Sequence, residues 1–370
     1  MFTCTIQQAI FFRHSTDNGI TFGPIRHLHG NNTDSGIAAN PTSVFLPPPT
    51  SAAAATATSG KAATTITSSQ MKDGTSSSTT TTSSSATSSV SDGGNGTLLV
   101  GYDCGGGNTG PICGGSPYGR TGMLRSNDNG ATWEQSYINH FLGAPFAGVA
   151  PGPGSGLLLK KGRYAGRIVY AGHHDVPTEE DVVWYSDDRG VTWTVSEGVV
   201  VVAGGGRNGG GDGGAGAFGA FVGFDEPQAT ELSDGTIFLS LRDDGSTRVR
   251  GAATSTDGGA TFKMAPSGSG LQLQQPEGGV MQPVITLQNG TVVTARPDRA
   301  GREIMTVFAS ATDGQTWNRT RTMYNGPAAY SALCQASNGQ VYIAFERDMA
   351  ASDCSGESCS IWWANVNGGG

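Results

Sequence analysis

The octapeptide Ser186-Asp-Asp-Arg-Gly-Val-Thr-Trp193 is the stretch that decides the fold, because related copies recur along the chain. The other copies begin at Ser15, Ser126, Ser255 and Ser310. In this pattern an Asp can hydrogen-bond the backbone of its own turn, and the Gly two residues later supplies a positive φ. β-Prone residues precede each copy, and an aromatic residue suited to burial ends it. Each copy therefore predicts the tip of a β-hairpin.

The spacing of these copies predicts a repeated sheet. The starts at positions 126, 186, 255 and 310 are 60, 69 and 55 residues apart, which fits a four-stranded propeller blade with its loop. The chain contains 58 glycines and only 14% charged residues, a composition that favours turns and strands over helices. The fifth copy is degenerate, because Thr312 replaces the central Asp. The aspartates expected in these turns are Asp17, Asp128, Asp187, Asp188, Asp257 and Asp313.

Composition divides the chain into three segments. Residues 1–48 are expected to form strands around the first octapeptide, and residues 97–370 carry the remaining copies. Between them, residues 49–96 consist mostly of Ser, Thr, Ala and Gly. Such a segment cannot bury enough apolar surface to offset the entropy of ordering it. We therefore expect a disordered insertion between two strands of one blade, within a single β domain of roughly 300 residues.

The overall charge limits the partners. The formal net charge is −8, which argues against binding to nucleic acid and means that local arginines have to hold any acidic ligand. The longest apolar runs, such as 218–224, are too short to span a bilayer. The glycines follow no nucleotide-binding pattern, and we expect neither a cofactor nor a metal. His173 and His174 are expected in a loop, or else on a rim that contacts sugar.

Cysteines and glycosylation sequons bear on the compartment. Cys104 and Cys113 flank a glycine-rich loop, and Cys354 and Cys359 flank another loop. Either pair can close a short disulfide in an oxidising compartment. The amino-terminal residues show no signal-peptide pattern, whereas four sequons point towards a secreted or lumenal protein, so the compartment stays open. The sequons are at Asn31, Asn95, Asn289 and Asn318.

The candidate chemistry lies between residues 224 and 346. Glu226 and Arg242 stand at the two ends of a strand, Ser-Asp-Gly turn and strand, so an antiparallel hairpin brings them to one rim. A cationic stretch, Arg296-Pro-Asp-Arg299-Ala-Gly-Arg302, follows a second hairpin. A third strand, turn and strand runs from Tyr330 to Glu346. Taken singly, Glu226 with Arg242 is also explained as a surface ion pair, and Tyr330 as an ordinary strand tyrosine.

Together these features resemble the exo-α-sialidase (neuraminidase) family, in which Asp-box, or BNR, repeats decorate a six-bladed β-propeller. The octapeptides resemble the Asp box. Glu226, followed by Arg242 across an Asp-Gly hairpin, resembles the catalytic hairpin of that family. An Arg shortly before an Asp box, then Tyr330-Ser331 and a strand ending at Glu346, is similar to the rest of its site. The resemblance covers nearly the whole chain outside the insertion. It implies an all-β, six-bladed propeller whose first blade is incomplete.

The resemblance also implies a role for each residue. Tyr330 is the expected nucleophile of a retaining glycosidase, and Glu226 is the base that activates it. Arg242 and Arg302 are expected to hold the substrate carboxylate, and Glu346 to orient a further arginine. A neutral phenol can approach the anomeric carbon of sialic acid, which bears a carboxylate, without repulsion until Glu226 takes its proton. Planar guanidinium groups suit that carboxylate because they bind it bidentately.

We therefore expect an enzyme that removes terminal sialic acid from sialylated glycans with retention of configuration. The sequence departs from the family pattern before Ser15, where the Arg of a Phe/Tyr-Arg-Ile-Pro motif and a downstream acid/base Asp are not found. Arg13, which enters the first box, is a poor substitute. The sequence leaves open a truncated enzyme of reduced activity and a degenerate propeller. A non-catalytic propeller that binds sialosides, and one that acts on another sugar, are the alternatives.

Overall fold

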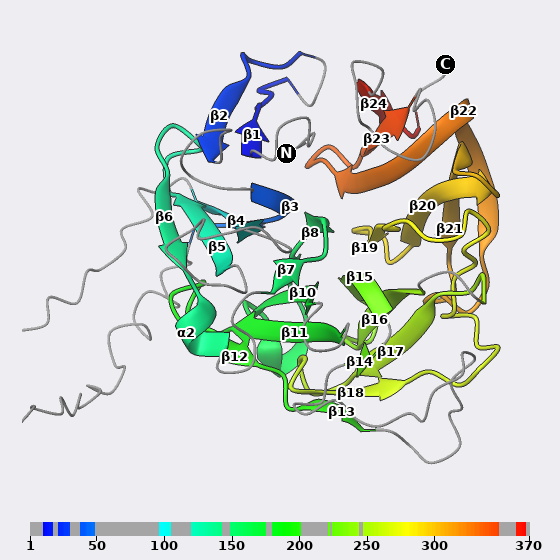
Figure 1. Ribbon diagram of the computed structural model, residues 1–370, viewed down its shortest axis with the longest axis horizontal. Coiled ribbons are helices and arrows are strands. Elements are labelled where there is room, and N and C mark those ends of the chain that lie inside the picture. Colours follow the sequence, from blue (N-terminus) through cyan, green and yellow to red (C-terminus); the bar gives the residue numbers. More distant parts are fainter. Residues whose placement is uncertain are drawn as a thin grey trace, which may run out of the picture.

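Strands form almost all of the regular structure. The computed structural model describes residues 10–17, 21–29, 38–48, 96–104, 120–142, 149–174, 180–200, 221–222, 224–243, 247–347 and 360–367. Its helical elements there are short: α2 (Asn139–Leu142) and the 3₁₀ turn η2 (Gly162–Tyr164). The sheets follow one another in chain order around a common centre (Figure 1). The all-β, propeller-like fold is therefore confirmed, whereas the predicted insertion at 49–96 falls almost entirely outside the described residues.

Within the described residues, four blades have four strands each in chain order. The first, the β3–β6 blade, contains β3 (Ala38–Leu46), β4 (Thr97–Cys104), β5 (Arg120–Ser126) and β6 (Glu134–Tyr137). The β7–β12 blade contains β7 (Ala150–Pro151), β10 (Ile168–His174), β11 (Glu180–Ser186) and β12 (Thr194–Val195). The β15–β18 blade contains β15 (Phe224–Glu231), β16 (Ile237–Asp243), β17 (Gly251–Ser255) and β18 (Thr261–Met264). The β19–β22 blade contains β19 (Val284–Thr286), β20 (Val292–Arg299), β21 (Glu303–Ser310) and β22 (Asn318–Gln335).

Further strands extend this ring. The second half of β22 pairs with β23 (Val341–Arg347), which pairs in turn with β24 (Ser360–Asn365). β1 (Ile10–Phe12) and β2 (Arg26–His29) form a separate sheet. The rings of Phe22 and Trp363 meet edge-on at 5.6 Å between centroids, so the loop between β1 and β2 contacts β24 (Figure 1). The short strands are β8 (Gly154–Ser155) beside β3, β9 (Leu157–Leu158) beside β10, β14 (Phe221–Val222) beside β11 and β13 (Gly198–Val200) parallel to β18.

The four octapeptides from Ser126 onwards each join the third strand of a blade to the fourth, as the hairpin prediction requires. In the copy at 186–193, Asp188 accepts the backbone N–H of Thr192 at 2.8 Å and its hydroxyl at 2.5 Å. Ser186 donates to the same carboxylate and accepts the N–H of Gly190, both at 2.8 Å. Each bond contributes about 1 kcal/mol, so the turn is held by its own side chains. Equivalent carboxylate bonds form at Asp17, Asp128 and Asp257.

Two of the aspartates expected in these turns have other partners. Asp187 points away from its own turn and binds Arg167 through two hydrogen bonds of 2.8 and 2.7 Å. Asp313 accepts the backbone N–H of Ser233 at 3.0 Å, together with the hydroxyl of that serine. Ser233 lies in the turn between β15 and β16, so Asp313 connects two blades. In the degenerate copy, Thr312 accepts the backbone N–H of Thr316 at 2.9 Å in place of the missing Asp.

Arginines link consecutive sheets through the same turns. In three places an arginine donates to a backbone carbonyl in the octapeptide of the next sheet along the chain. Because those carbonyls lie in a turn that its own side chains hold rigid, each arginine meets a fixed acceptor. The sheets are thereby tied together at their outer edge. The pairs are Arg26 with Gly130, Arg125 with Arg189, and Arg167 with Gly258.

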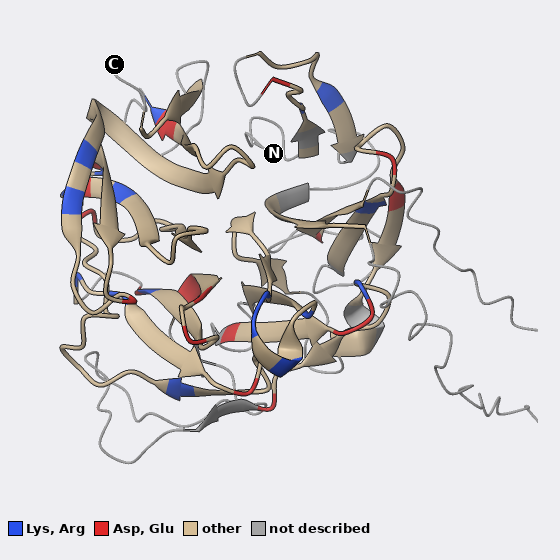
Figure 2. Ribbon diagram, turned by 180° about the vertical axis from the view of Figure 1, so that it is seen from behind, with Lys and Arg blue, Asp and Glu red and all other residues tan. Residues whose placement is uncertain are grey.

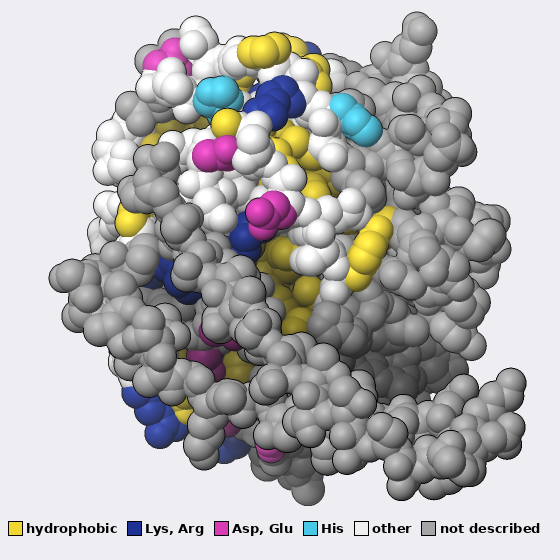
Figure 3. Space-filling view, turned by 90° about the vertical axis from the view of Figure 1, so that its left-hand side faces the viewer, with side chains coloured by type: hydrophobic (Ala, Val, Ile, Leu, Met, Phe, Trp, Pro, Cys, Tyr) yellow, Lys and Arg dark blue, Asp and Glu magenta, His cyan; other side chains and the backbone are white. Residues whose placement is uncertain are grey.

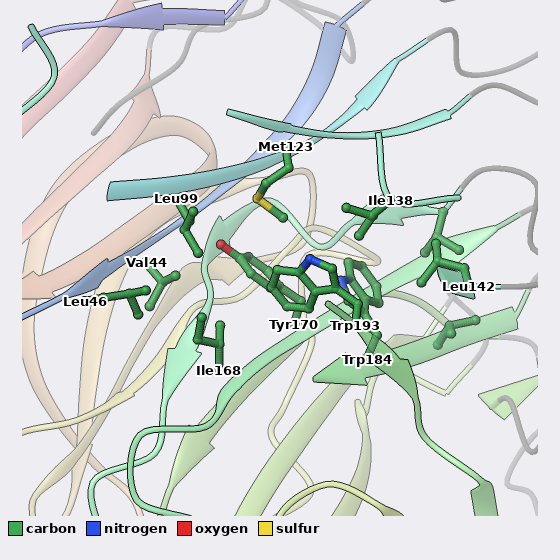
Figure 4. Packing of buried hydrophobic residues seen from close by; sticks show 12 residues of the cluster. Val44, Leu46, Leu99, Met123, Ile138, Leu142, Ile168, Tyr170, Trp184 and Trp193 are labelled. Atoms are coloured by element: carbon green, nitrogen blue, oxygen red, sulfur yellow. The ribbon is translucent and has the colours of Figure 1, made fainter. Parts of the chain in front are cut away.

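Apolar cores fill the spaces between neighbouring blades. Figure 4 shows the core between the β3–β6 and β7–β12 blades, where Tyr170, Trp184 and Trp193 pack with Leu99 and Met123 from the opposite sheet. Tyr170 stacks on Trp184 with 5.9 Å between the ring centroids, and the centroid of the Trp193 ring lies 5.3 Å from that of Tyr170. Trp193 ends its octapeptide, so the repeat supplies a core residue as well as a turn. Burying each such side chain stabilises the fold by about 1.5–3 kcal/mol.

Charged side chains are few, in keeping with the low charged fraction of the sequence. Figure 2 shows them scattered over both strands and turns. On the face in Figure 3, hydrophobic, acidic, basic and histidine side chains are mixed over the described surface. No described helix is long and apolar enough to cross a membrane. Cys104 is disulfide-bonded, whereas Cys113, Cys354 and Cys359 lie outside the described residues.

Candidate functional site

The predicted hairpin brings Glu226 and Arg242 together. Glu226 lies on β15 and Arg242 on β16, and Arg242 stands opposite Asp225 in the register of the two strands. The ladder is irregular between Asp225 and Gln228, and Glu226 has a φ of 41°. This backbone conformation is costly for a residue with a side chain. Asp225 supports it by accepting the N–H of Glu226 at 2.7 Å. The irregularity turns the Glu226 side chain towards the neighbouring blade.

Tyr330 reaches Glu226 from β22. Its hydroxyl donates to Glu226 Oε1 at 2.5 Å, and Arg242 Nη1 donates to Glu226 Oε2 at 2.6 Å. Arg242 Nη1 also lies 3.4 Å from the Tyr330 hydroxyl and 3.0 Å from Asp225 Oδ2. The β22–β23 ladder is irregular between Ala328 and Ser331, which places Tyr330 in a bulge. The Glu226 carboxylate thus accepts one hydrogen bond from a phenol and one from a guanidinium at the same time.

Arg302 is the arginine of the cationic stretch that approaches Tyr330. Its guanidinium carbon lies 5.9 Å from the centre of the Tyr330 ring, and its Nη2 donates to the carbonyl of Gly279 at 2.8 Å. Arg299 is instead a surface residue, 67% exposed and paired with Glu303. Arg296 bonds Asp298 and packs over Phe308 at 3.9 Å. Of the three arginines, Arg302 is the one that the resemblance assigned to the substrate carboxylate.

Glu346 lies on β23 beside Tyr330. Its Oε2 accepts the backbone N–H of Tyr330 at 3.2 Å, which fixes the main chain of the candidate nucleophile. Burial raises the pKa of Glu346, and the Tyr330 amide and the charge of Arg302 oppose that rise. Glu346 therefore hydrogen-bonds Tyr330, and the charge of Arg302 acts on it. The further arginine that the resemblance assigns to Glu346 has no counterpart among the contacts of the described residues.

The electrostatics of the cluster suit proton transfer. Burial raises the pKa of Glu226, and the positive charge of Arg242 opposes this rise. Burial also raises the pKa of Tyr330, and the negative charge of Glu226 adds to the effect. The pKa of Arg242 is raised: desolvation lowers it, but the surrounding negative groups, led by Glu226, outweigh that effect. The raised pKa of Tyr330 keeps the proton on the phenol, and the ionised form of Glu226 is placed to receive it.

Sequence reasoning missed a buried layer behind this cluster. Arg250 is fully buried; it donates to Ser240 Oγ at 2.8 Å, to the Val280 carbonyl at 3.0 Å and to the Glu226 carbonyl at 3.4 Å. Burial lowers the pKa of Arg250 to about 10, so it stays charged at neutral pH. Glu277 lies in the same layer. Arg250 precedes a strand and Glu277 sits in a Pro-Glu-Gly-Gly turn, and neither pattern distinguishes a buried charge from an exposed one.

The histidine pair is not in a loop, so that prediction was wrong. His173 and His174 are the last residues of β10, which pairs with β11. His173 Nδ1 lies 3.1 Å from Asp225 Oδ1, and its side chain is largely buried. Among the described residues, no group of three His, Cys, Asp or Glu side chains is arranged to hold a metal ion.

Asp-box hairpins arranged as propeller blades, with a tyrosine, a glutamate and arginines meeting at the strand ends, define a propeller of the sialidase type. The family of BNR repeat-like domains matches residues 61–343, and the chain belongs to the sialidases with BNR, or Asp-box, repeats. Over 247 residues it is 27% identical to the "Sialidase" of Micromonospora viridifaciens. That match covers 60% of this chain and 33% of the relative. The resemblance expected from the sequence is thus confirmed.

Solved sialidase structures share the fold. A Hadza microbial sialidase superposes with a TM-score of 0.61 at 19% identity, covering 93% of this chain and 58% of that chain. The Trypanosoma rangeli sialidase in complex with sialic acid gives 0.58 at 16% identity, covering 96% of this chain and 49% of that one. At these identities the likeness concerns the fold. The chain spans about a third of the curated relative, and half to three-fifths of these two structures.

Proposed function

We propose that this chain is an exo-α-sialidase-like glycoside hydrolase that removes terminal sialic acid from sialylated glycans. The observation that carries the proposal is the hydrogen bond of 2.5 Å between the Tyr330 hydroxyl and Glu226, with Arg242 on the other oxygen of the same carboxylate. A phenol paired with a buried carboxylate is an activated nucleophile, and a nearby arginine can bind the carboxylate of the sugar. Family membership supports the assignment of the substrate class.

In the proposed reaction, Arg242 and Arg302 hold the substrate carboxylate and present the anomeric carbon to Tyr330. The phenol oxygen attacks that carbon while its proton passes to Glu226, and the aglycone leaves as an oxyanion that takes a proton from water. Water then attacks the anomeric carbon of the tyrosyl intermediate, the phenolate leaves and takes back the proton from Glu226, and the configuration is retained. Glu346 holds the Tyr330 backbone during both steps. The arginines also keep the substrate carboxylate in place as the ring flattens towards an oxocarbenium ion.

We also propose that the ring has six blades. Four are complete within the described residues, and β22 continues into a fifth sheet with β23 and β24. The first octapeptide lies between β1 and β2, just as later copies lie between the third and fourth strands of their blades. The β1–β2 sheet therefore corresponds to the outer half of a further blade. The contact of Phe22 with Trp363 supports its place next to β24.

The test is release of a fluorescent phenol from an aryl α-sialoside by the purified chain and by its Tyr330→Phe variant. An acidic phenol leaves without help from a general acid, so this substrate isolates the step that Tyr330 and Glu226 perform. We expect turnover in the parent chain and a loss of roughly 10²–10⁴-fold in the variant, whose ring fits the same space without a nucleophile. Turnover that survives in Tyr330→Phe would overturn the assignment. Binding of sialosides without turnover by either protein would favour a non-catalytic propeller.

A further inference from the structure

The turn that contains Glu277 passes between the two arginines of the candidate site. The carbonyl of Gly279 accepts the hydrogen bond from Arg302 Nη2 at 2.8 Å. A Cβ at Gly279 would lie 3.3 Å from Arg242 Nε, so a side chain there would press on the second arginine. Gly278 and Gly279 have φ values of 90° and 125°, which residues with side chains avoid. The glycines therefore let the turn that carries Glu277 fit between the two arginines.

The carboxylate of Glu277 is buried without a partner side chain. The residue is 6% exposed, and neither carboxylate oxygen hydrogen-bonds another described residue. Burial raises its pKa to about 7, and the positive charges of Arg250, Arg296 and Arg302 oppose the rise. Arg248 and Arg242 lie against the two glycines that follow it. Every charged group placed around Glu277 by these contacts is therefore an arginine.

We infer that Glu277 is a positioning residue that sets the net charge of the arginine layer, so that its protonation strengthens binding of the substrate carboxylate and its ionisation weakens it. The inference rests on the proposed function, because it concerns the arginines assigned to that carboxylate. An ionised Glu277 partly neutralises the positive charges of Arg302 and Arg250. A neutral Glu277 leaves their charge for the ligand. In a buried site of low dielectric, adding or removing one charge beside the arginines changes the affinity for the substrate carboxylate on the order of threefold to tenfold.

The sign with pH follows directly. The carboxylate of a sialoside stays ionised above about pH 4, so its own charge is constant over the relevant window. Glu277 is mostly neutral below its pKa of about 7 and mostly ionised above it. Affinity should therefore be higher at pH 5.5 than at pH 8.5. By linkage, a bound carboxylate raises the pKa of Glu277 further, and binding near neutrality draws a proton from the buffer.

The first measurement is the binding of methyl α-sialoside by calorimetry in the Tyr330→Phe background, which prevents turnover. Buffers with different ionisation enthalpies report the protons taken up. We expect uptake of a fraction of a proton at pH 7 and a dissociation constant about three to ten times larger at pH 8.5 than at pH 5.5. No uptake, or an affinity independent of pH, would overturn the inference. This experiment requires no substitution at Glu277.

The second measurement adds Glu277→Gln, which has the shape of the neutral acid and cannot ionise. We expect it to bind at pH 8.5 about as tightly as the unsubstituted protein does at pH 5.5, and to lose the proton uptake. Glu277→Asp keeps an ionisable group and should keep the pH dependence. Glu303→Gln is the matched control, because it removes an exposed carboxylate next to Arg302 and should change nothing. A parallel loss of affinity at every pH in Glu277→Gln would mean a merely structural role.

The two proposals fail in different ways. If the chain neither binds nor cleaves any sialoside, the proposed function is wrong, and the proposed role of Glu277 as a positioning residue is wrong as well. If the chain cleaves sialosides with the expected dependence on Tyr330, while Glu277→Gln keeps the parent pH profile, the function stands and only the role of Glu277 is lost.

Discussion

Glu226 carries the pH dependence expected of the chemical step. Burial raises its pKa above the ordinary glutamate value, and only the ionised form can take the proton of Tyr330. We therefore expect kcat/KM on an aryl α-sialoside to fall as the pH drops through that raised pKa, at a pH above the value of about 4.3 typical of free glutamate. If kcat/KM instead fell at the ordinary pKa of glutamate, the result would contradict the burial of Glu226. Circular dichroism at each pH distinguishes the fall in activity caused by protonation from one caused by unfolding. Protonation of Glu277 acts in the opposite direction, on KM.

At the same scale, the sequence reaches some residues of the site and not others. Glu226 and Arg242 were predictable as neighbours because a short hairpin fixes which strand ends meet. The resemblance selects Arg302 among the three arginines of the cationic stretch, whereas its hydrogen bond to the Gly279 carbonyl was not predictable, because another part of the chain supplies that carbonyl. The sequence did not indicate that Glu277 is buried, because the burial of a charged residue depends on how the surrounding blades pack. The assigned roles themselves stay predictions.

The octapeptide is the element whose behaviour the sequence predicts best, because its contacts lie within eight residues. Its degenerate copy offers a test. Thr312 accepts the backbone N–H of Thr316 there and shares a neutral hydrogen bond with its hydroxyl, whereas Asp188 in the intact copy accepts the equivalent two bonds on a charged carboxylate. We expect Thr312→Asp to raise the free energy of unfolding by about 0.5–1 kcal/mol, measured by urea denaturation. The adjacent Asp187 and Asp188 show that the turn accommodates two neighbouring carboxylates.

Thr312→Ala is the comparison for that change. It removes the bond without a replacement, and it should lower the free energy of unfolding by a similar amount. A Thr312→Asp protein less stable than the parent would show that repulsion from Asp313, which is already engaged with Ser233, exceeds the gain. The same pair of variants indicates whether the regular Asp is retained for stability or for another reason.

At the scale of the whole molecule, the arginine links between sheets should contribute to cooperative unfolding. Arg167 binds Asp187, donates to the Gly258 carbonyl of the next blade at 2.9 Å, and packs over Tyr185 at 4.0 Å. We expect Arg167→Met to lower the free energy of unfolding by about 1–3 kcal/mol, because it leaves a buried carbonyl without its charged donor. Denaturant titration followed by tryptophan fluorescence measures this.

Arg163→Met is the matched control for Arg167→Met. Arg163 is exposed and packs over Tyr164 at 4.6 Å, the same distance at which Arg167 packs over that ring, but Arg163 is not among the arginines that link sheets. Its substitution should change stability by less than about 0.5 kcal/mol. Equal effects of the two substitutions would mean that the contact with the tyrosine, and not the link to the next blade, carries the stability. The sequence predicted that blades repeat but not these links, which depend on how consecutive sheets dock.

The bond between Tyr330 and Glu226 joins positions 104 residues apart, on two different sheets. A ligand seated on this pair and on Arg302 would therefore hold the sheets against each other from the inside. Any molecule that binds only the native state adds RT ln(1 + [L]/Kd) to the free energy of unfolding, about 2.7 kcal/mol at a hundredfold excess over Kd. Substrate would thus protect the chain from proteases that attack an opened ring, and scarcity of substrate would shorten its lifetime.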